Sequence, residues 1–228
     1  MSLAAIIEAL SVWALPVLLA ITLHEAAHGW AAWRLGDDTA YRQGRVSFNP
    51  LRHIDPVGTI LVPGLLLLSG TRMLFGWAKP VPVAFHRLRR PRLDMVWVAA
   101  AGPGANLCLA LASALLLHAA FLLPEEGRGF AAANLVNSVH INVLLAVFNM
   151  LPIPPLDGGR VAVGLLPDAL ARPLARLERY GLFIILGLMF ILPLASQSMG
   201  FDVNPFAWAV GGPADILTRA IAELTGHR

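Results

Sequence analysis

The residues with the clearest chemical potential are two histidines four positions apart, His24 and His28, with Glu25 between them. In a helix, side chains four residues apart lie on one face, so both imidazoles can reach one metal ion. This is the H-E-x-x-H pattern, in which the histidines bind zinc and the glutamate takes a proton from the metal-bound water. The spacing therefore predicts a catalytic metal site with Glu25 as the base.

The position of this motif strengthens the prediction. It lies inside an apolar stretch, residues 3–33, whose only other charged residue is Glu8. An ionisable side chain in a membrane costs about 2.5–3.5 kcal/mol on insertion scales and marks function by default. In a soluble helix the same residues would often be no more than a polar face. In this apolar stretch they favour a bound metal ion.

A third ligand is needed, because two histidines leave a metal site too open. Asp157 is the candidate: it follows a proline-rich run, residues 152–155, and precedes two glycines. Prolines stop a helix, and broken backbone at membrane depth is tolerated only where it is buried in protein or lines a cavity. A loop turn in which Asp157 caps the next helix would give the same pattern. The presence of His24 and His28 favours ligation.

The elements that must position these residues are membrane helices. Hydrophobic residues make up 57% of the 228 residues and charged residues 14%, whereas a soluble domain has about 45–50% and about 25%. The single cysteine excludes a disulfide framework. We expect an all-α polytopic membrane protein with about four to six transmembrane helices. The apolar stretches are residues 3–33, 56–75, 93–123, 131–152 and 180–199.

The topology follows from the metal site, since His24 and Asp157 must lie at one depth. Five full crossings would separate them, so residues 56–75, broken at Pro63-Gly64, are expected to re-enter on one side. That arrangement puts 14 of the 17 Lys and Arg residues on the same side of the membrane. The positive-inside rule makes this side cytoplasmic, with the active site nearer to it and both termini outside.

The remaining segments are short. We expect one integral-membrane domain over residues 1–228, with a core of about 3–165, a C-terminal helix at 180–199 and a surface tail at 200–228. Residues 41–48 are predicted as a short β-like element at the membrane edge, able to hold an unwound substrate by strand addition.

Five motifs then resemble one family. HEAAH at 24–28 and NMLPIPPLDGGR at 149–160 resemble the site-2 proteases, which are intramembrane zinc metalloproteases, and AGPGAN at 101–106 is similar to a third motif of that family. GWAKPVPV at 76–83, with NPLRHIDP at 49–56, resembles the compact bacterial subgroup. This chain has room for neither the PDZ nor the CBS domains that the family often carries.

The resemblance implies a role for each site residue. His24, His28 and Asp157 would bind one Zn²⁺, and Glu25 would be the catalytic base. Asn149 would help to hold the substrate or the oxyanion. Asn106 contacts either the substrate or a neighbouring helix, and His53, in a subgroup motif, is a candidate to line the substrate cavity.

The expected function is hydrolysis of peptide bonds within or near transmembrane segments, as in regulated intramembrane proteolysis. The partners are then a membrane-spanning protein substrate and the lipid bilayer. Nucleic acid is not expected, because the arginines fall between apolar stretches. Two alternatives stay open, a metal-ion transporter and a proteolytically inactive scaffold that binds membrane proteins. The excess of Arg over Lys points to a bacterial or archaeal cell membrane.

Overall fold

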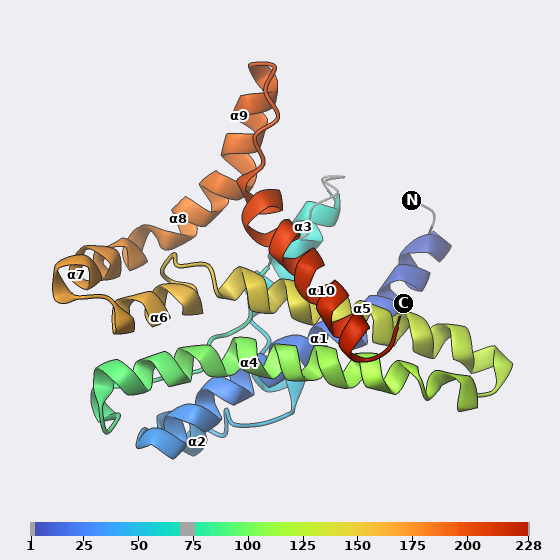
Figure 1. The fold of residues 1–228 in the computed structure, drawn as a ribbon, viewed down its shortest axis with the longest axis horizontal. Coiled ribbons are helices and arrows are strands. Elements are labelled where there is room, and N and C mark those ends of the chain that lie inside the picture. The colour runs from blue at the N-terminus through green and yellow to red at the C-terminus, as the bar shows by residue number, and fades with distance from the viewer. Residues whose placement is uncertain (1–2, 69–75, 228) are drawn as a thin grey trace.

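The computed structural model describes residues 3–68 and 76–227, and this part of the chain contains helices and loops but no strand. The helices are α1 (Leu3–Leu35), α2 (Thr39–Arg42), α3 (Val62–Leu68), α4 (Pro91–Leu117), α5 (Glu125–Asn149), α6 (Asp157–Leu165), α7 (Asp168–Arg176), α8 (Gly181–Leu186), α9 (Leu192–Ser198) and α10 (Gly212–Leu224). Figure 1 shows their arrangement.

Four helical stretches of the described chain are long and apolar enough to cross a membrane: Leu10–Leu35, Pro91–Leu117, Glu125–Asn149 and Asp168–Ser198. The all-α polytopic class is thereby confirmed. The third of these begins earlier than the predicted stretch at 131–152, because Glu125 and Glu126 occupy its first turn, where carboxylates favour a helix N-terminus.

The core is a bundle in which α1, α4 and α5 lie against one another and α6 packs on α4. Small residues line the contacts, among them Ala32, Ala99, Ala110 and Ala146, all of them buried. Such residues let membrane helices approach closely. The last helix, α10, returns over α4 and α5 and buries Ile221 there.

The stretch predicted to re-enter begins with a π-helical turn, Pro56–Leu61, and continues into α3. The apolar helix Pro56–Leu66 is too short to span a bilayer. The N–H of Trp77 donates to the carbonyl of Gly58 (3.1 Å), and the hydroxyl of Thr59 donates to the carbonyl of Trp77 (2.8 Å). The start of the stretch therefore lies beside Trp77, the second residue after its end, as re-entry requires. Residues 69–75 fall outside the described part.

The prediction of a β-like element at 41–48 is wrong. Tyr41 and Arg42 belong to α2, and turns follow. The carboxylate of Asp37 accepts hydrogen bonds from the backbone N–H and the hydroxyl of Thr39, at 3.1 and 2.5 Å. An aspartate bonded to the backbone two residues on forms a turn, so this local bonding overrides the weak alternation of residues 41–47. Gly44, at φ +64°, closes the next turn.

The predicted helix at 180–199 is present as α8, a π-helical turn at Gly187–Ile191, and α9. We call residues 177–198 the arm. Figure 1 shows α8 and α9 extending away from α1, α4 and α5. Near its base, Ile185 and Met189 pack against Leu156, in the loop that precedes α6.

Candidate metal and catalytic site

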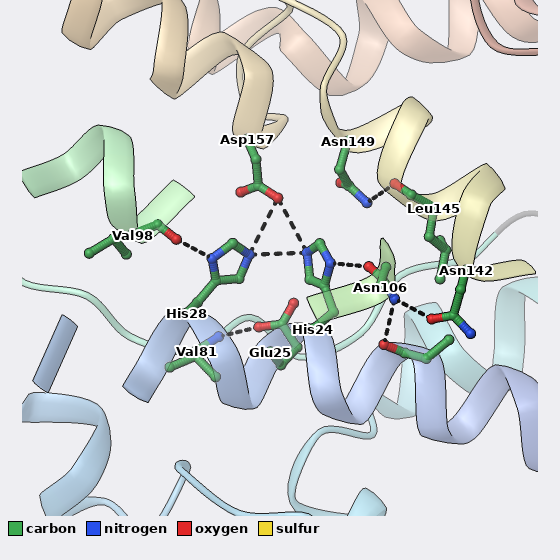
Figure 2. A network of polar contacts seen from close by, with 11 residues as sticks. His24, Glu25, His28, Val81, Val98, Asn106, Asn142, Leu145, Asn149 and Asp157 are labelled. Atoms are coloured by element: carbon green, nitrogen blue, oxygen red, sulfur yellow. Dashed lines mark hydrogen bonds and ion pairs between the residues drawn. The ribbon is translucent and has the colours of Figure 1, made fainter. Parts of the chain in front are cut away.

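The two histidines of HEAAH lie one turn apart on α1, and both are buried, with exposed fractions of 7% and 8%. Their rings meet edge to face, and the two Nε2 atoms are 3.0 Å apart. Asp157, the first residue of α6, places its Oδ2 at 3.2 Å from Nε2 of His24 and 3.3 Å from Nε2 of His28. The structure thus brings together the three predicted ligands (Figure 2).

The first turn of α6 is pressed against the loop before it, and glycine makes this possible. A Cβ on Gly158 would collide with the backbone of Met150, and one on Gly159 would lie 2.7 Å from the backbone of Ile153. Because both positions lack a side chain, residues 150–156 fold directly onto the helix. This packing holds Asp157 at the imidazoles.

Each imidazole is oriented by a bond on its far side. Nδ1–H of His28 donates to the carbonyl of Val98 (2.7 Å), and Nδ1–H of His24 donates to Oδ1 of Asn106 (2.6 Å). Both acceptors belong to α4. With Nδ1 protonated, each ring directs the lone pair of Nε2 toward the other ring and toward Asp157.

This donor set fits a small divalent cation. Two lone pairs and a carboxylate oxygen repel one another at 3.0–3.3 Å unless a positive charge lies between them. Zn²⁺ bound tetrahedrally at about 2.05 Å would hold its ligand atoms about 3.3 Å apart. An ionised Asp157 carboxylate would complete this set, because a metal ligand must be deprotonated.

Glu25 lies beside the ligands but is not one of them. Its Oε2 accepts a hydrogen bond from the backbone N–H of Val81 (2.8 Å). Val81 is flanked by Pro80 and Pro82, which have no N–H, so it offers the one backbone donor of that tripeptide. Figure 2 shows the second carboxylate oxygen of Glu25 on the side of the imidazoles.

The other predicted site residues have different surroundings. Asn149, the last residue of α5, donates one amide hydrogen to the carbonyl of Leu145 (3.0 Å), and Figure 2 shows it on the Asp157 side of the site. His53 is buried in a loop, where its Nε2–H donates to the carbonyl of Ser47 (3.0 Å), outside the ligand cluster. Asn106 is fully buried, and its amide is engaged by protein groups rather than open to a substrate.

Sequence reasoning missed three contacts of the site. Val81 reaches Glu25, Val98 reaches His28, and Gly102 lies against both rings: a Cβ there would be 2.7 Å from Cε1 of His24 and closer still to His28. The Pro-Val-Pro pattern, which isolates one N–H, is a signal for the first. The second uses a backbone carbonyl, which leaves no mark in the sequence.

Comparisons with known proteins agree with one another. The model of a family described as peptidase family M50 matches residues 130–192, which include Asn149 and Asp157. A protein of Bacillus subtilis (strain 168), provisionally named zinc metalloprotease YwhC, is 39% identical over 187 residues, which are 79% of this chain and 80% of that protein.

Two mycobacterial proteins, both provisionally named zinc metalloprotease Rip2, are similar as well. That of Mycobacterium tuberculosis (strain H37Rv) is 32% identical over 89% of this chain, and that of Mycolicibacterium smegmatis is 30% identical over 91%. The matches cover 77% of each relative. No solved structure matches the chain significantly.

Proposed function

Because the chain belongs to peptidase family M50, the site-2 protease family, we propose that it is a zinc metalloprotease that cleaves peptide bonds within or near transmembrane segments of other proteins. One observation carries the proposal: two imidazoles and a carboxylate converge on one point, with Glu25 beside them. The motif lies within the apolar span Leu10–Leu35, where such a cluster would be costly without a ligand.

His24, His28 and Asp157 would hold the zinc ion, and three protein ligands leave a position open for water or substrate. When bound, zinc acts as a Lewis acid, which lowers the pKa of a water molecule toward about 7 and polarises the scissile carbonyl. The remaining work falls to side chains of this protein.

Glu25 takes the proton of the attacking water and returns it to the leaving amine. The bond from Val81 to its Oε2 leaves the other oxygen for this transfer. Asn149 uses one of its two amide hydrogens on Leu145, so the second can stabilise the oxyanion that forms at the carbonyl. A substrate helix has its backbone groups bonded internally, so it must unwind before it can be cleaved.

We place the site nearer the cytoplasmic face of a bacterial or archaeal cell membrane, in a single domain. Support comes from the 14 basic residues on the side of the loops that follow α1 and precede α4. A cysteine at the exposed position Gln43, in a Cys108→Ser background, should react only with reagents that reach the cytoplasm. One at the exposed position Arg128 should react only from outside, and the opposite pattern would reverse the orientation.

The zinc content and the proteolytic activity of the detergent-purified protein test the proposal together. We expect one zinc ion per chain in the wild type and in Glu25→Gln, and much less in Asp157→Ala. Cleavage of a reconstituted membrane-spanning substrate should be lost in both variants. Zinc without cleavage in the wild type would favour a scaffold, and zinc transport that survives Glu25→Gln would favour a transporter.

A further inference from the structure

Asn106 is the most completely bonded polar side chain near the site. It has no exposed surface, and it links three helices. Its Oδ1 accepts from Nδ1–H of His24 on α1 (2.6 Å). Its Nδ2 donates to the carbonyl of Ala20 on α1 (3.1 Å) and to Oδ1 of Asn142 on α5 (2.7 Å).

The donor and acceptor in each of these bonds are fixed, because the chain of bonds ends at a backbone carbonyl of α5. The Nδ2 group of Asn142, also fully buried, donates to the carbonyl of Ser138 (2.8 Å), which can only accept. Asn142 must therefore present its oxygen to Asn106. Asn106 must then present its NH₂ group to Asn142 and Ala20, which leaves its oxygen facing His24.

An oxygen acceptor at Nδ1 of His24 determines the tautomer of that ring. Nδ1 carries the proton and Nε2 carries the lone pair, and only this form can bind a metal ion through Nε2. If the amide of Asn106 were reversed, it would present N–H to Nδ1 and favour the proton on Nε2, at the metal position. The donor and acceptor roles along Ser138, Asn142 and Asn106 thus determine which nitrogen of His24 carries the proton.

We propose that Asn106 is a positioning residue for the zinc ligand His24, and that Asn142, together with the carbonyl of Ala20, holds the amide of Asn106 in one orientation. The inference rests on the proposed zinc site. Groups that fix the far nitrogen of a zinc-bound histidine change metal affinity by about 10–100-fold in other proteins. The partner of His28 is a backbone carbonyl, so His24 is the ligand whose orientation depends on a side chain.

The test is the zinc dissociation constant of the full-length detergent-purified protein, measured by competition with a chelator. Asn106→Leu keeps the approximate size but removes the acceptor, and we expect it to weaken zinc binding by about 10–100-fold. Asn106→Asp loses the same two donor bonds but keeps an acceptor for Nδ1–H of His24. It should therefore bind zinc more tightly than Asn106→Leu, which lost packing alone does not explain.

A matched control is available between α5 and α1. Asn137 of α5 donates to the carbonyl of Val12 of α1 (3.1 Å), and this bond involves neither a ligand nor Asn106 and Asn142. Asn137→Leu should therefore leave the zinc dissociation constant unchanged. If it weakens zinc binding as much as Asn106→Leu does, the effect belongs to helix packing and the proposal fails.

Asn142→Leu keeps the test open if both Asn106 variants fail to fold. It removes one of the two acceptors that hold the amide of Asn106, the other being the carbonyl of Ala20, and should weaken zinc binding by a smaller factor than Asn106→Leu. Wild-type affinity would overturn the role of Asn142. Equal zinc affinity of the wild type and Asn106→Leu would overturn this inference alone. A wild-type protein that binds no zinc would overturn the proposed function and the inference with it.

Discussion

The bundle of α1, α4 and α5 and the arm at residues 177–198 are both apolar enough to cross a membrane, yet they bond their polar groups differently. In the bundle, several buried polar side chains reach other helices: Asn106 bonds His24 and Asn142, and Ser113 bonds Ser138. In the arm, the hydroxyl groups of Ser196 and Ser198 donate to carbonyls of the preceding turn, and Ser196 also accepts from the N–H of Val203, a few residues beyond the arm.

Hydropathy identifies membrane helices but does not show which of them hold the groups that do chemistry. A polar group within a bilayer must be bonded, and it can be bonded by its own helix or by a neighbour. Bonds to a neighbour fix the relative positions of two helices, as a ligand set requires. Bonds within one helix leave its position relative to the others unconstrained.

The largest loss of zinc affinity is expected from a substitution on α4, at the point where this helix lies against the two histidine ligands. Gly102→Ala places a methyl group against both imidazoles, so the rings must move and the ligand set is disrupted. We expect zinc affinity to fall by at least about 100-fold, that is, by about 2.7 kcal/mol or more. Metal analysis of the purified protein, with cleavage as a second measurement, checks this.

Gly104→Ala is the matched control, because a Cβ at Gly104 meets no atom within 4 Å. It should keep zinc and activity at wild-type values. If both variants bind zinc equally well, close packing of α4 on the two imidazoles does not position the ligands.

A smaller loss of zinc affinity is expected from a substitution where the arm contacts the loop before Asp157. A Cβ on Gly181 would collide with the carbonyl oxygen of Pro154, in the loop that leads to Asp157. Gly181→Ala should displace this loop and weaken zinc binding about tenfold, or about 1.4 kcal/mol. Gly187→Ala, further along the arm, meets no atom within 4 Å and should leave zinc binding unchanged. Equal effects would mean that the arm influences the site throughout its length.

A third, pH-dependent effect concerns Asp37, which joins the end of α1 to the segment that reaches Glu25. Burial raises its pKa, but bonds from Thr39 and the N–H of Ala84 and the charge of Arg87 lower the pKa by more, to below its usual value. Its contribution to stability is therefore complete above about pH 4 and is lost as the pH falls through the lowered pKa.

Asp37→Asn should lower the free energy of unfolding at pH 7 by about 1–3 kcal/mol. It should also remove this part of the acid dependence. Thermal unfolding midpoints between pH 7 and pH 3 measure both effects. Parallel pH curves for the variant and the wild type would contradict the assignment.

The smallest effect is expected on the outer surface of the arm. Phe183 is 73% exposed, and we expect Phe183→Ala to change the free energy of unfolding in detergent by less than about 0.5 kcal/mol, with zinc binding unchanged. A thermal shift assay suffices. A large loss would show that the arm is held by more than the contacts at its base.

The sequence was informative where a local pattern has one physical meaning. The spacing of His24 and His28 predicted two side chains on one helix face, and the proline run before Asp157 predicted a break there; the structure brings all three together. The four long spans also followed from composition.

The sequence failed where a contact joins distant residues or where two local preferences compete. Nothing near Asn106 shows that its oxygen faces His24, because Asn142 and the carbonyl of Ala20, both on other helices, determine this orientation. Nothing near Glu25 identifies Val81 as its donor. At residues 41–48, weak alternation predicted a strand, but the carboxylate of Asp37 bonds Thr39 and a helical turn forms instead.

The order of the ligands along the chain has a consequence for how the protein is made. Synthesis proceeds from the N-terminus, so α1 enters the membrane before its partners exist. His24, Glu25 and His28 then lie in an apolar helix without Val98 and Asn106 of α4, which follow 70 and 82 residues after their histidines. Asp157 comes later still. The metal centre can therefore be completed only after α6 has been synthesised, and until α4 follows, His24 and His28 lack these two partners.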